Sequence, residues 1–295
     1  ANGTSLTYQW QVNTGSGFAN ITTSGSNPTY SNWNSDTLHV NSTIASNNGS
    51  QYRCIVSGAC PSPVSSNAAT LNVNTAPAMN NQPANSTICP GANTYFNITA
   101  TGTNLVYQWQ VNTGSGFTNI TATGSNPSYS NWTSDTLRLT STIPGNNGYL
   151  YRCVISGTCP SSLTSNILSL GVNNTPSIVS HLSSTTICAG NNASFGISAT
   201  GSSLTYQWQV NTGSGFADIT VSGTNPTYTN WTNDTLRVNS SIAANNGFQY
   251  RCIVSFICAS PLTSNAATLT VNIAPSIISH PSASTLCAGS NTSFG

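Results

Sequence analysis

The sequence predicts an all-β protein made of tandem antiparallel β-sandwich domains that repeat every 99 residues. The first observation behind this prediction is a stretch from Tyr8 to Phe18 that returns word for word at 107–117 and 206–216. A period of this length indicates copies of a whole domain, because solenoid repeats are shorter. The second observation is that apolar and polar residues alternate along the stretch, which is typical of a strand with one buried face.

Each copy is expected to be organised around the tryptophan of this strand. These predicted core anchors are Trp10, Trp109 and Trp208. In the middle copy, residues 94–102 read as the strand before the tryptophan strand at 105–111. The chain then turns and returns at 117–121, and further strands follow at 135–140, 149–156 and 168–172. Seven short strands with a tryptophan in the third match the immunoglobulin plan, so we predict Ig-like sandwiches.

Prolines at matching places mark the junctions between copies: Pro77, Pro176 and Pro275. Four segments are predicted from them. Residues 1–75 are an Ig-like domain that lacks its first two strands, and 76–174 and 175–273 are complete domains. Residues 274–295 are the opening strands of a next domain.

The composition excludes several classes of function. Charged residues make up only 3% of the chain and the net charge is +1. Such a surface gives no electrostatic hold on nucleic acid or anionic lipid. No apolar run reaches the roughly 18 residues of a membrane span, so no membrane insertion is expected. A surface with so little charge should self-associate unless something else hydrates it, and covalent glycans are the candidate.

The nine cysteines are spaced as three per copy. They are Cys54, Cys60 and Cys89, then Cys153, Cys159 and Cys188, then Cys252, Cys258 and Cys287. Zinc is the rival explanation, but it needs four clustered ligands and no histidine recurs near these cysteines. Regular cysteines in a β-protein indicate disulfides and an oxidising setting, either extracellular or at the cell surface.

A family resemblance rests on motifs that recur along the whole chain. In the middle copy they are Cys89-Pro90-Gly91, Tyr107-Gln108-Trp109-Gln110, Asp135-Thr136-Leu137, Tyr151-Arg152-Cys153 and Ser165-Asn166. This set resembles the tandem Ig-like and PKD-like repeats of large secreted or surface proteins of Bacteroidota. The resemblance implies a place in long adhesin or matrix arrays and specifies no activity, because the fold hosts many roles.

The disulfide pairing has two readings. Strand order alone places Cys89 and Cys153 towards the same end of the sandwich. The resemblance implies Cys89–Cys159 and Cys188–Cys258 instead, with Cys54, Cys153 and Cys252 left as buried thiols. Cys287 would then bridge to Cys60 or Cys54 of a following unit.

Two kinds of glycosylation site are candidates. The Asp-Thr-Leu motif recurs in all three copies and is similar to the O-glycosylation acceptor of Bacteroidota, which marks Thr37, Thr136 and Thr235. The alternative is that the aspartate caps a turn before a strand. Asn-x-Ser/Thr sequons do not recur in every copy, and the candidates for N-glycans are Asn20, Asn119, Asn131 and Asn230.

No enzyme is predicted. The four acids are Asp36, Asp135, Asp218 and Asp234, too few and too scattered for paired carboxylates or a calcium site. His39 lies near Asp36, but arginine replaces it in the other copies. We therefore expect no catalytic residue, no metal and no cofactor other than covalent glycans.

Two functions remain from the sequence. The first is a structural repeat unit of an extracellular, glycosylated filament or surface stalk, joined head to tail through Ig-like domains. The alternative is a multivalent adhesin that binds carbohydrate, including surface glycans, through Trp33, Trp132 and Trp231. The competing interpretation of these tryptophans is packing beneath a loop.

The register of the chain ends predicts the assembly. Ala1 aligns with Ala100, and Gly295 aligns with Gly196, two residues short of the same alanine. The chain is then either a window cut from a longer repeated polymer or a subunit completed by its neighbour, and in both cases residues 274–295 would supply the strands that a further copy lacks. Phe294 would take the place beside Trp10 that Phe96 and Phe195 fill beside the other core tryptophans. The expected partners are further copies of the same chain.

Overall fold

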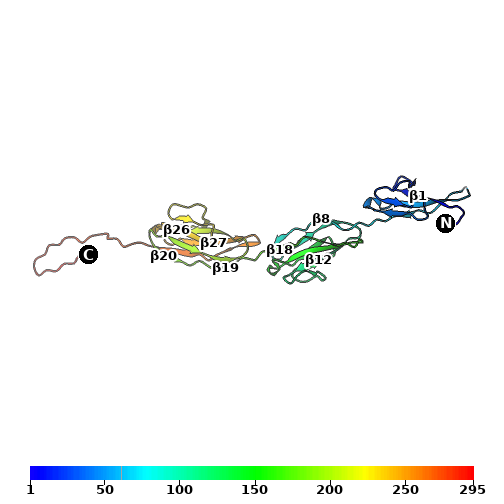
Figure 1. Cartoon of the computed structure of the whole chain (residues 1–295). Coiled ribbons are helices and arrows are strands. Elements are labelled where there is room, and N and C mark those ends of the chain that lie inside the picture. Colours follow the sequence, from blue (N-terminus) through cyan, green and yellow to red (C-terminus); the bar gives the residue numbers. More distant parts are fainter. Residues whose placement is uncertain (61) are drawn as a thin grey trace. The chain divides into compact units, whose positions relative to one another are not determined.

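Short β-strands make up most of the regular structure. The computed structural model describes residues 1–60 and 62–295, drawn in Figure 1. Among these residues the helical elements are three short 3₁₀ turns at equivalent places in the copies, namely η1 (Ala45–Asn47), η2 (Pro144–Asn146) and η3 (Ala243–Asn245). The predicted all-β fold class is confirmed.

The chain divides into two compact units. Unit 1 contains residues 1–86, 93–141 and 148–171. Unit 2 contains residues 87–92, 142–147 and 172–295. The middle copy thus contributes to both units, and the two units do not follow the predicted copy boundaries.

The first copy lies in unit 1 and has seven strands among its described residues. Its larger sheet has the order β2-β1-β5-β6, with β7 also paired to β5, and β3 pairs with β4. The strands are β1 (Thr7–Asn13), β2 (Ala19–Asn20), β3 (Thr29–Ser31), β4 (His39–Asn41), β5 (Gln51–Ser57), β6 (Val64–Ser65) and β7 (Ala69–Thr70).

The middle copy has eleven strands. Its sheets have the orders β13-β12-β16-β18-β9 (with β17 on β16), β10-β15-β14, and β11-β8. The strands are β8 (Ala78–Asn81), β9 (Ser86–Ile88), β10 (Thr94–Asn97), β11 (Thr99–Thr101), β12 (Val106–Asn112), β13 (Thr118–Asn119), β14 (Ser128–Ser130), β15 (Thr136–Thr140), β16 (Leu150–Ser156), β17 (Leu163–Thr164) and β18 (Leu168–Val172).

The third copy, in unit 2, repeats this plan. Its sheets have the orders β20-β29-β27-β23-β24 (with β28 on β27), β21-β26-β25, and β19-β22. The strands are β19 (Ser177–Ser180), β20 (Thr185–Cys188), β21 (Ala193–Gly196), β22 (Ser198–Thr200), β23 (Thr205–Asn211), β24 (Phe216–Asp218), β25 (Thr227–Thr229), β26 (Thr235–Asn239), β27 (Gln249–Phe256), β28 (Ala259–Thr263) and β29 (Ala267–Asn272).

The centre of each copy is an antiparallel pair that contains the repeated tryptophan strand. The pair has the same register every time, with tryptophan directly opposite cysteine. These pairs are Trp10–Cys54, Trp109–Cys153 and Trp208–Cys252. Since side chains of a strand alternate between its two faces, this register places both residues of a pair on the core face.

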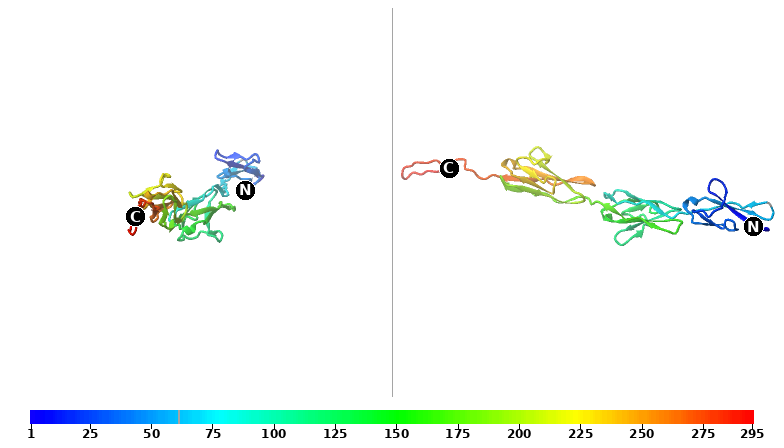
Figure 2. Two further views of the ribbon diagram at one scale, coloured as in Figure 1. Left: turned by 90° about the vertical axis from the view of Figure 1, so that its left-hand side faces the viewer. Right: turned by 45° about the horizontal axis from the view of Figure 1, so that its top comes forward.

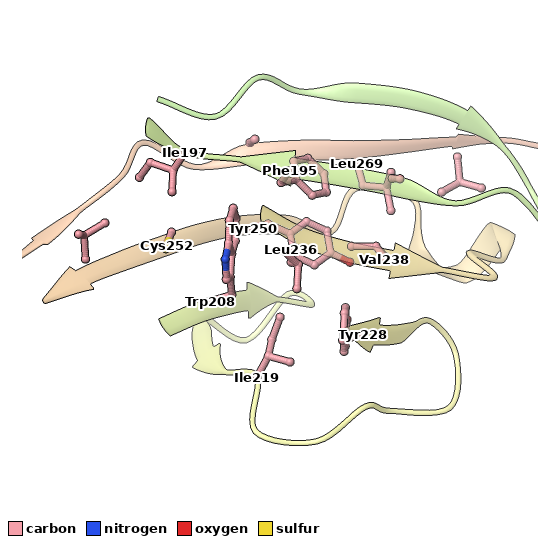
Figure 3. Packing of buried hydrophobic residues seen from close by; sticks show 14 residues of the cluster. Phe195, Ile197, Trp208, Ile219, Tyr228, Leu236, Val238, Tyr250, Cys252 and Leu269 are labelled. Carbon is pink, nitrogen blue, oxygen red and sulfur yellow. The ribbon is translucent and has the colours of Figure 1, made fainter. Parts of the chain in front are cut away.

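The core of the third copy lies between its sheets, as Figure 3 shows. Trp208 is fully buried, and its indole Nε1 donates to the backbone carbonyl of Asn233 at 2.8 Å. Phe195 stacks on Tyr250 with ring centroids 4.7 Å apart. Because the indole N–H is hydrogen-bonded, the large ring is buried with no unsatisfied donor.

The predicted core anchors are buried in two copies out of three. Trp109 is fully buried and Phe96 packs beside it, with ring centroids 6.4 Å apart. Trp10, by contrast, is only half-buried, so its prediction as a buried anchor is wrong for this chain. The physical reason is that no side chain equivalent to Phe96 covers it within the described residues of the first copy.

Candidate assembly and modification sites

The loop tryptophans Trp33, Trp132 and Trp231 fold back onto the core strands. The backbone carbonyl of Trp132 accepts a hydrogen bond from the amide of Trp109 at 2.9 Å, and the other copies repeat this contact. Trp231 is half-buried and packs against the core of the third copy. These contacts favour packing beneath a loop over an exposed platform for a sugar ring.

The asparagine before each loop tryptophan adopts a left-handed backbone conformation. The φ angles are 60° at Asn32, 61° at Asn131 and 62° at Asn230. Asparagine tolerates this region better than other residues with a side chain, which explains its presence in all three copies. Asn131 and Asn230, the two that carry sequons, are exposed.

A surface relay surrounds the other predicted N-glycan site. In the middle copy Gln110 Nε2 donates to Asn119 Oδ1 at 2.8 Å, and Arg152 Nε donates to Gln110 Oε1 at 2.6 Å. The Arg152 guanidinium also lies 4.2 Å from the centre of the Phe117 ring. The first copy repeats the relay with Asn20, and the third copy with Asp218.

This relay explains why a sequon need not recur. It uses only the side-chain oxygen of Asn119, so the aspartate of the third copy serves equally well as acceptor. The amide nitrogen of Asn20 and Asn119, which is where an N-glycan attaches, makes no hydrogen bond among the described residues. Sequence reasoning missed the relay, although its Gln, Arg and Phe recur in every copy.

The predicted O-glycosylation threonines differ in exposure. Thr37 is exposed, whereas Thr136 and Thr235 are half-buried at the start of β15 and β26. There they pair with Asn97 and Gly196 respectively. Within the described residues, the carboxylates of the preceding aspartates accept no hydrogen bond, so the structure gives no support to a capping role.

The structure contains one disulfide among the described residues, between Cys89 and Cys258. This pairing contradicts the expected bridges Cys89–Cys159 and Cys188–Cys258. Cys89 follows β9 of the middle copy, whereas Cys258 lies in the turn between β27 and β28 of the third copy. The bridge therefore joins two successive copies. Period and strand order locate a cysteine within its own copy and carry no information on such a link.

The remaining seven cysteines are thiols of two kinds. Cys54, Cys153 and Cys252 are buried, as predicted. Burial raises the pKa of Cys153 and Cys252 to about 12, although a backbone hydrogen bond to each thiol acts in the opposite direction and lowers the pKa. Cys60, Cys188 and Cys287 are exposed, and Cys159 is half-buried.

This division predicts how the thiols react with iodoacetamide at pH 8 in the native state. Cys60, Cys188 and Cys287 should be alkylated readily, because a thiolate forms only where solvent reaches the sulfur. Cys153 and Cys252 should react only after unfolding. Peptide mass spectrometry of native and unfolded samples measures this directly. Alkylation of Cys153 at the rate of Cys188 in folded protein would contradict the assigned core.

The same two thiols make stability depend on pH. Their pKa rises from 9.0 in the unfolded chain to about 12 in the fold. Between these values the unfolded state has lost a proton that the native state keeps, so the free energy of unfolding should fall as the pH rises from about 9 to about 12. Urea midpoints measured across this range, with a Cys153→Ala variant as control, should show a smaller decline in the variant.

The first copy has a hollow on its surface in unit 1. Its volume is about 690 Å³, and its apolar lining includes Ala1, Leu6, Val56 and Val64. Gly3 and Gly58 also line it. Cys60 is also among its lining residues.

In the middle copy, the surface equivalent to this hollow is covered by other residues of the chain. Gly102 and Gly157 are the counterparts of Gly3 and Gly58. A Cβ atom added at Gly102 would lie 3.1 Å from Cα of Pro77, and one added at Gly157 would lie 3.4 Å from its Cγ. Pro77 leads into β8, which pairs with β11. The hollow of the first copy thus lies where Pro77 and β8 pack in the middle copy.

Residues 274–295, all of them described, form no strand and are exposed throughout; Figures 1 and 2 draw them in red. Their apolar side chains match residues that are packed in the third copy. Ile178 and Ile187 pack against that core and Phe195 belongs to it. The counterparts Ile277, Leu286 and Phe294 are 73%, 48% and 62% exposed.

Neither a metal site nor a membrane-spanning helix is found in the described part of the chain. No group of three or more histidine, cysteine or acidic side chains gathers there closely enough to hold a metal ion. The same residues contain no helix of the length and apolarity needed to cross a bilayer.

Comparisons with known proteins define the fold. No family model and no curated protein matches the sequence. Among solved structures, a variant of titin domains I67–I69 with glutamate-to-alanine substitutions has a TM-score of 0.54 and 15% identity, covering 90% of this chain and 88% of that one. The I-band fragment I67–I69 from titin has a TM-score of 0.53 at the same identity and coverage. This likeness, together with the sheets described above, shows that the chain is a tandem array of immunoglobulin-like domains.

Proposed function

We propose that this chain is a structural repeat unit of an extracellular, glycosylated filament or surface stalk whose copies join head to tail through Ig-like domains. The observation that carries the proposal is the match between the hollow of the first copy and residues 274–295. Both are apolar and exposed, and their counterparts cover each other in the other copies. Exposed apolar segments beside an uncovered apolar hollow invite association, and stable proteins usually cover them.

The repeated register specifies how the two surfaces would meet. Ala100 pairs with Met79 in the middle copy, and Ala199 pairs with Ile178 in the third. The same register places Ile277 of one chain opposite Ala1 of another. Pro275 would then lie on Gly3 and Gly58, as Pro77 lies on their counterparts. Phe294 would cover Trp10 and complete its burial.

A non-enzymatic, extracellular role agrees with the chemistry of the chain. A disulfide between copies favours an oxidising compartment. The low charge leaves association to apolar contact and backbone pairing rather than to steering by charge. Half-burial of Trp231 against the core favours a structural role over the adhesin alternative, which requires exposed platforms.

Light scattering of the full chain tests the head-to-tail contact. The protein should grow beyond its 30.6 kDa monomer as concentration rises. Ile277→Asp should hold it at the monomer, because the charge would have to be buried in the hollow. Val221→Asp is the matched control: Val221 is 69% exposed but lies outside the segment, so this variant should still assemble.

Three results would contradict the head-to-tail proposal. The first is a wild-type chain that stays at the monomer mass over the whole concentration range. The second is an Ile277→Asp variant that assembles like wild type. The third is equal loss of assembly in Ile277→Asp and Val221→Asp, which would point to general solubility rather than to this contact.

Glycosylation is tested on protein from its natural source. We expect O-glycans on the peptides that contain Thr37, Thr136 and Thr235, and N-glycans on peptides with exposed sequons such as Asn119. Peptide mapping after release of the glycans would locate them. Thr37 is the most exposed of the three threonines and should show the highest occupancy. Recovery of the peptides that contain Thr37, Thr136 and Thr235 only in unmodified form would contradict this part of the proposal.

A further inference from the structure

The disulfide between Cys89 and Cys258 follows a rule that can be extended to the other copies. Each 99-residue period has one cysteine at the place where β9 and β20 end; we call Cys89, Cys188 and Cys287, which occupy this place in successive periods, the strand-end cysteines. Each also has one cysteine in the loop after its long central strand; Cys60, Cys159 and Cys258 are the loop cysteines. The bridge joins a strand-end cysteine to the loop cysteine of the copy that follows.

The surroundings of this bridge are specific and lie within unit 2. The Cα atoms of Cys89 and Cys258 are 5.3 Å apart. Asn173 Nδ2 donates to the Cys258 sulfur at 3.4 Å, and the Asn173 amide donates to the carbonyl of Ile88 at 3.0 Å. Asn173 thus ties the strand that precedes Cys89 to the incoming loop.

The third copy presents the same arrangement beside an exposed thiol. Cys188 ends β20 and pairs in parallel register with Asn272, the counterpart of Asn173 one period later. The amide of Ala189 donates to the Asn272 carbonyl at 2.8 Å. Both Cys188 and Asn272 are exposed. An approaching loop cysteine would find here the contacts that Cys258 finds beside Cys89.

The free thiols outside the core include equal numbers of strand-end and loop cysteines. Two are strand-end cysteines, Cys188 and Cys287, and two are loop cysteines, Cys60 and Cys159. If a second chain follows the first in the 99-residue register, the copy after Cys188 is the one that contains Cys60 of the second chain. The copy after Cys287 is then the one that contains Cys159 of that chain.

We propose that successive chains are joined covalently by two disulfides, Cys188 to Cys60 and Cys287 to Cys159 of the next chain. This inference rests on the proposed head-to-tail function and adds a covalent lock to it. It also replaces the expected bridge from Cys287 to Cys60. Cys54, Cys153 and Cys252 take no part, because they are buried beside the core tryptophans.

The chemistry requires an oxidant, which is a small-molecule disulfide. A thiolate at Cys188 attacks that disulfide, forms a mixed disulfide and releases one small thiol. The thiolate of Cys60 from the next chain then attacks the Cys188 sulfur and releases the second small thiol. Two protein thiols are thereby oxidised and one small disulfide is reduced to two thiols, which take up through solvent the two protons that the protein thiols lose. Cys188 and Cys60 are both exposed, so both are accessible to this exchange.

The test uses the full chain, oxidised glutathione, and electrophoresis under denaturing, non-reducing conditions. Wild-type protein should give a ladder of covalent multimers that dithiothreitol collapses to the monomer. Peptide mapping should recover the linked pairs Cys188–Cys60 and Cys287–Cys159. The double variant Cys188→Ser, Cys287→Ser should lose the ladder. Cys89→Ser is the matched control, since it removes a strand-end cysteine whose bridge lies within one chain, and its ladder should persist.

The outcomes separate this inference from the function on which it rests. Multimers seen by light scattering in dithiothreitol, without any Cys188–Cys60 peptide after oxidation, would overturn the covalent lock and leave the head-to-tail contact standing. Bridges from Cys188 to Cys159 or Cys258 of its own chain would also overturn it. A protein that stays monomeric by scattering under both conditions would overturn both proposals.

Discussion

Replacing Trp109 with alanine is expected to destabilise the middle copy by about 3–5 kcal/mol, the range for large-to-small changes at fully buried aromatic positions. The side chain is fully buried, packs beside Phe96, and donates its indole N–H to the carbonyl of Ser134 at 2.9 Å. Alanine would leave a cavity and an unpaired carbonyl. Hydrogen exchange of the β12 and β16 amides in the full chain measures the effect copy by copy. Since 1.4 kcal/mol is a factor of ten, exchange should accelerate by roughly two to four orders of magnitude.

The first copy provides a control for this variant. Trp10 occupies the equivalent position and makes the same indole bond, to Ser35 at 3.0 Å, but it is only half-buried. Trp10→Ala should therefore accelerate exchange of the β1 and β5 amides clearly less than Trp109→Ala does for β12 and β16. Equal effects in the two copies, or a loss below about 1 kcal/mol at Trp109, would contradict the packing that we assign.

Loss of the disulfide through Cys89→Ser is expected to cost about 2–4 kcal/mol, the usual contribution of a native bridge. The cost should appear within unit 2, where the bridge holds the strand end of the middle copy to the β27–β28 turn. The hydrogen bond from Asn173 to the Cys258 sulfur should weaken with it, because nothing then keeps that sulfur in place. A thiol assay should detect Cys258 as a new free cysteine, and urea unfolding should begin at a lower concentration.

Cys188→Ser is the matched control for this second variant. Cys188 occupies the same place in the third copy, but its thiol is exposed and unpaired within the chain. In dilute, monomeric protein this change should leave the unfolding curve within about 0.5 kcal/mol of wild type, as surface substitutions do. If Cys89→Ser and Cys188→Ser behaved alike, the bridge between copies would contribute nothing to stability.

Much of the fold could be predicted because the pattern within each copy is local. Alternation along the Tyr-Gln-Trp-Gln strand sets which side chains enter the core, and the structure places Trp109 and Cys153 opposite each other as that pattern requires. A one-residue slip would turn every apolar side chain to solvent, so the register is strongly determined. Period-2 patterning thus predicted the sandwich, whereas the buried thiols were expected from the disulfide pairing that the family resemblance implies.

The pairing of the exposed cysteines could not be predicted in the same way. Strand order places Cys89 at an end of its sandwich, but which loop of which copy meets that end is a matter of how copies follow one another. Hydrophobic alternation carries no information on such contacts, because they involve loops. Asn173 beside the bridge and its counterpart Asn272 beside Cys188 indicate a linkage site only once their contacts are known.

Whether the candidate site residues are accessible depends on their burial, which residue type alone does not reveal. By residue type alone, the loop tryptophans could be stacking platforms. Their backbone carbonyls, however, accept hydrogen bonds from the backbone amides of the core tryptophans, which fixes the loops against the core strands. Trp10 looks like Trp109 by sequence, and only the absence of a covering phenylalanine among the described residues distinguishes them.

Cryo-electron microscopy of the protein at a concentration where it multimerises would show how successive chains are joined. We expect chains joined end to end, with residues 274–295 of one chain forming strands on the first copy of the next. Phe294 should then lie over Trp10, at the spacing seen between Phe96 and Trp109. Residues 274–295 folded onto the first copy of their own chain, or multimers joined side by side with Trp10 uncovered, would contradict the account.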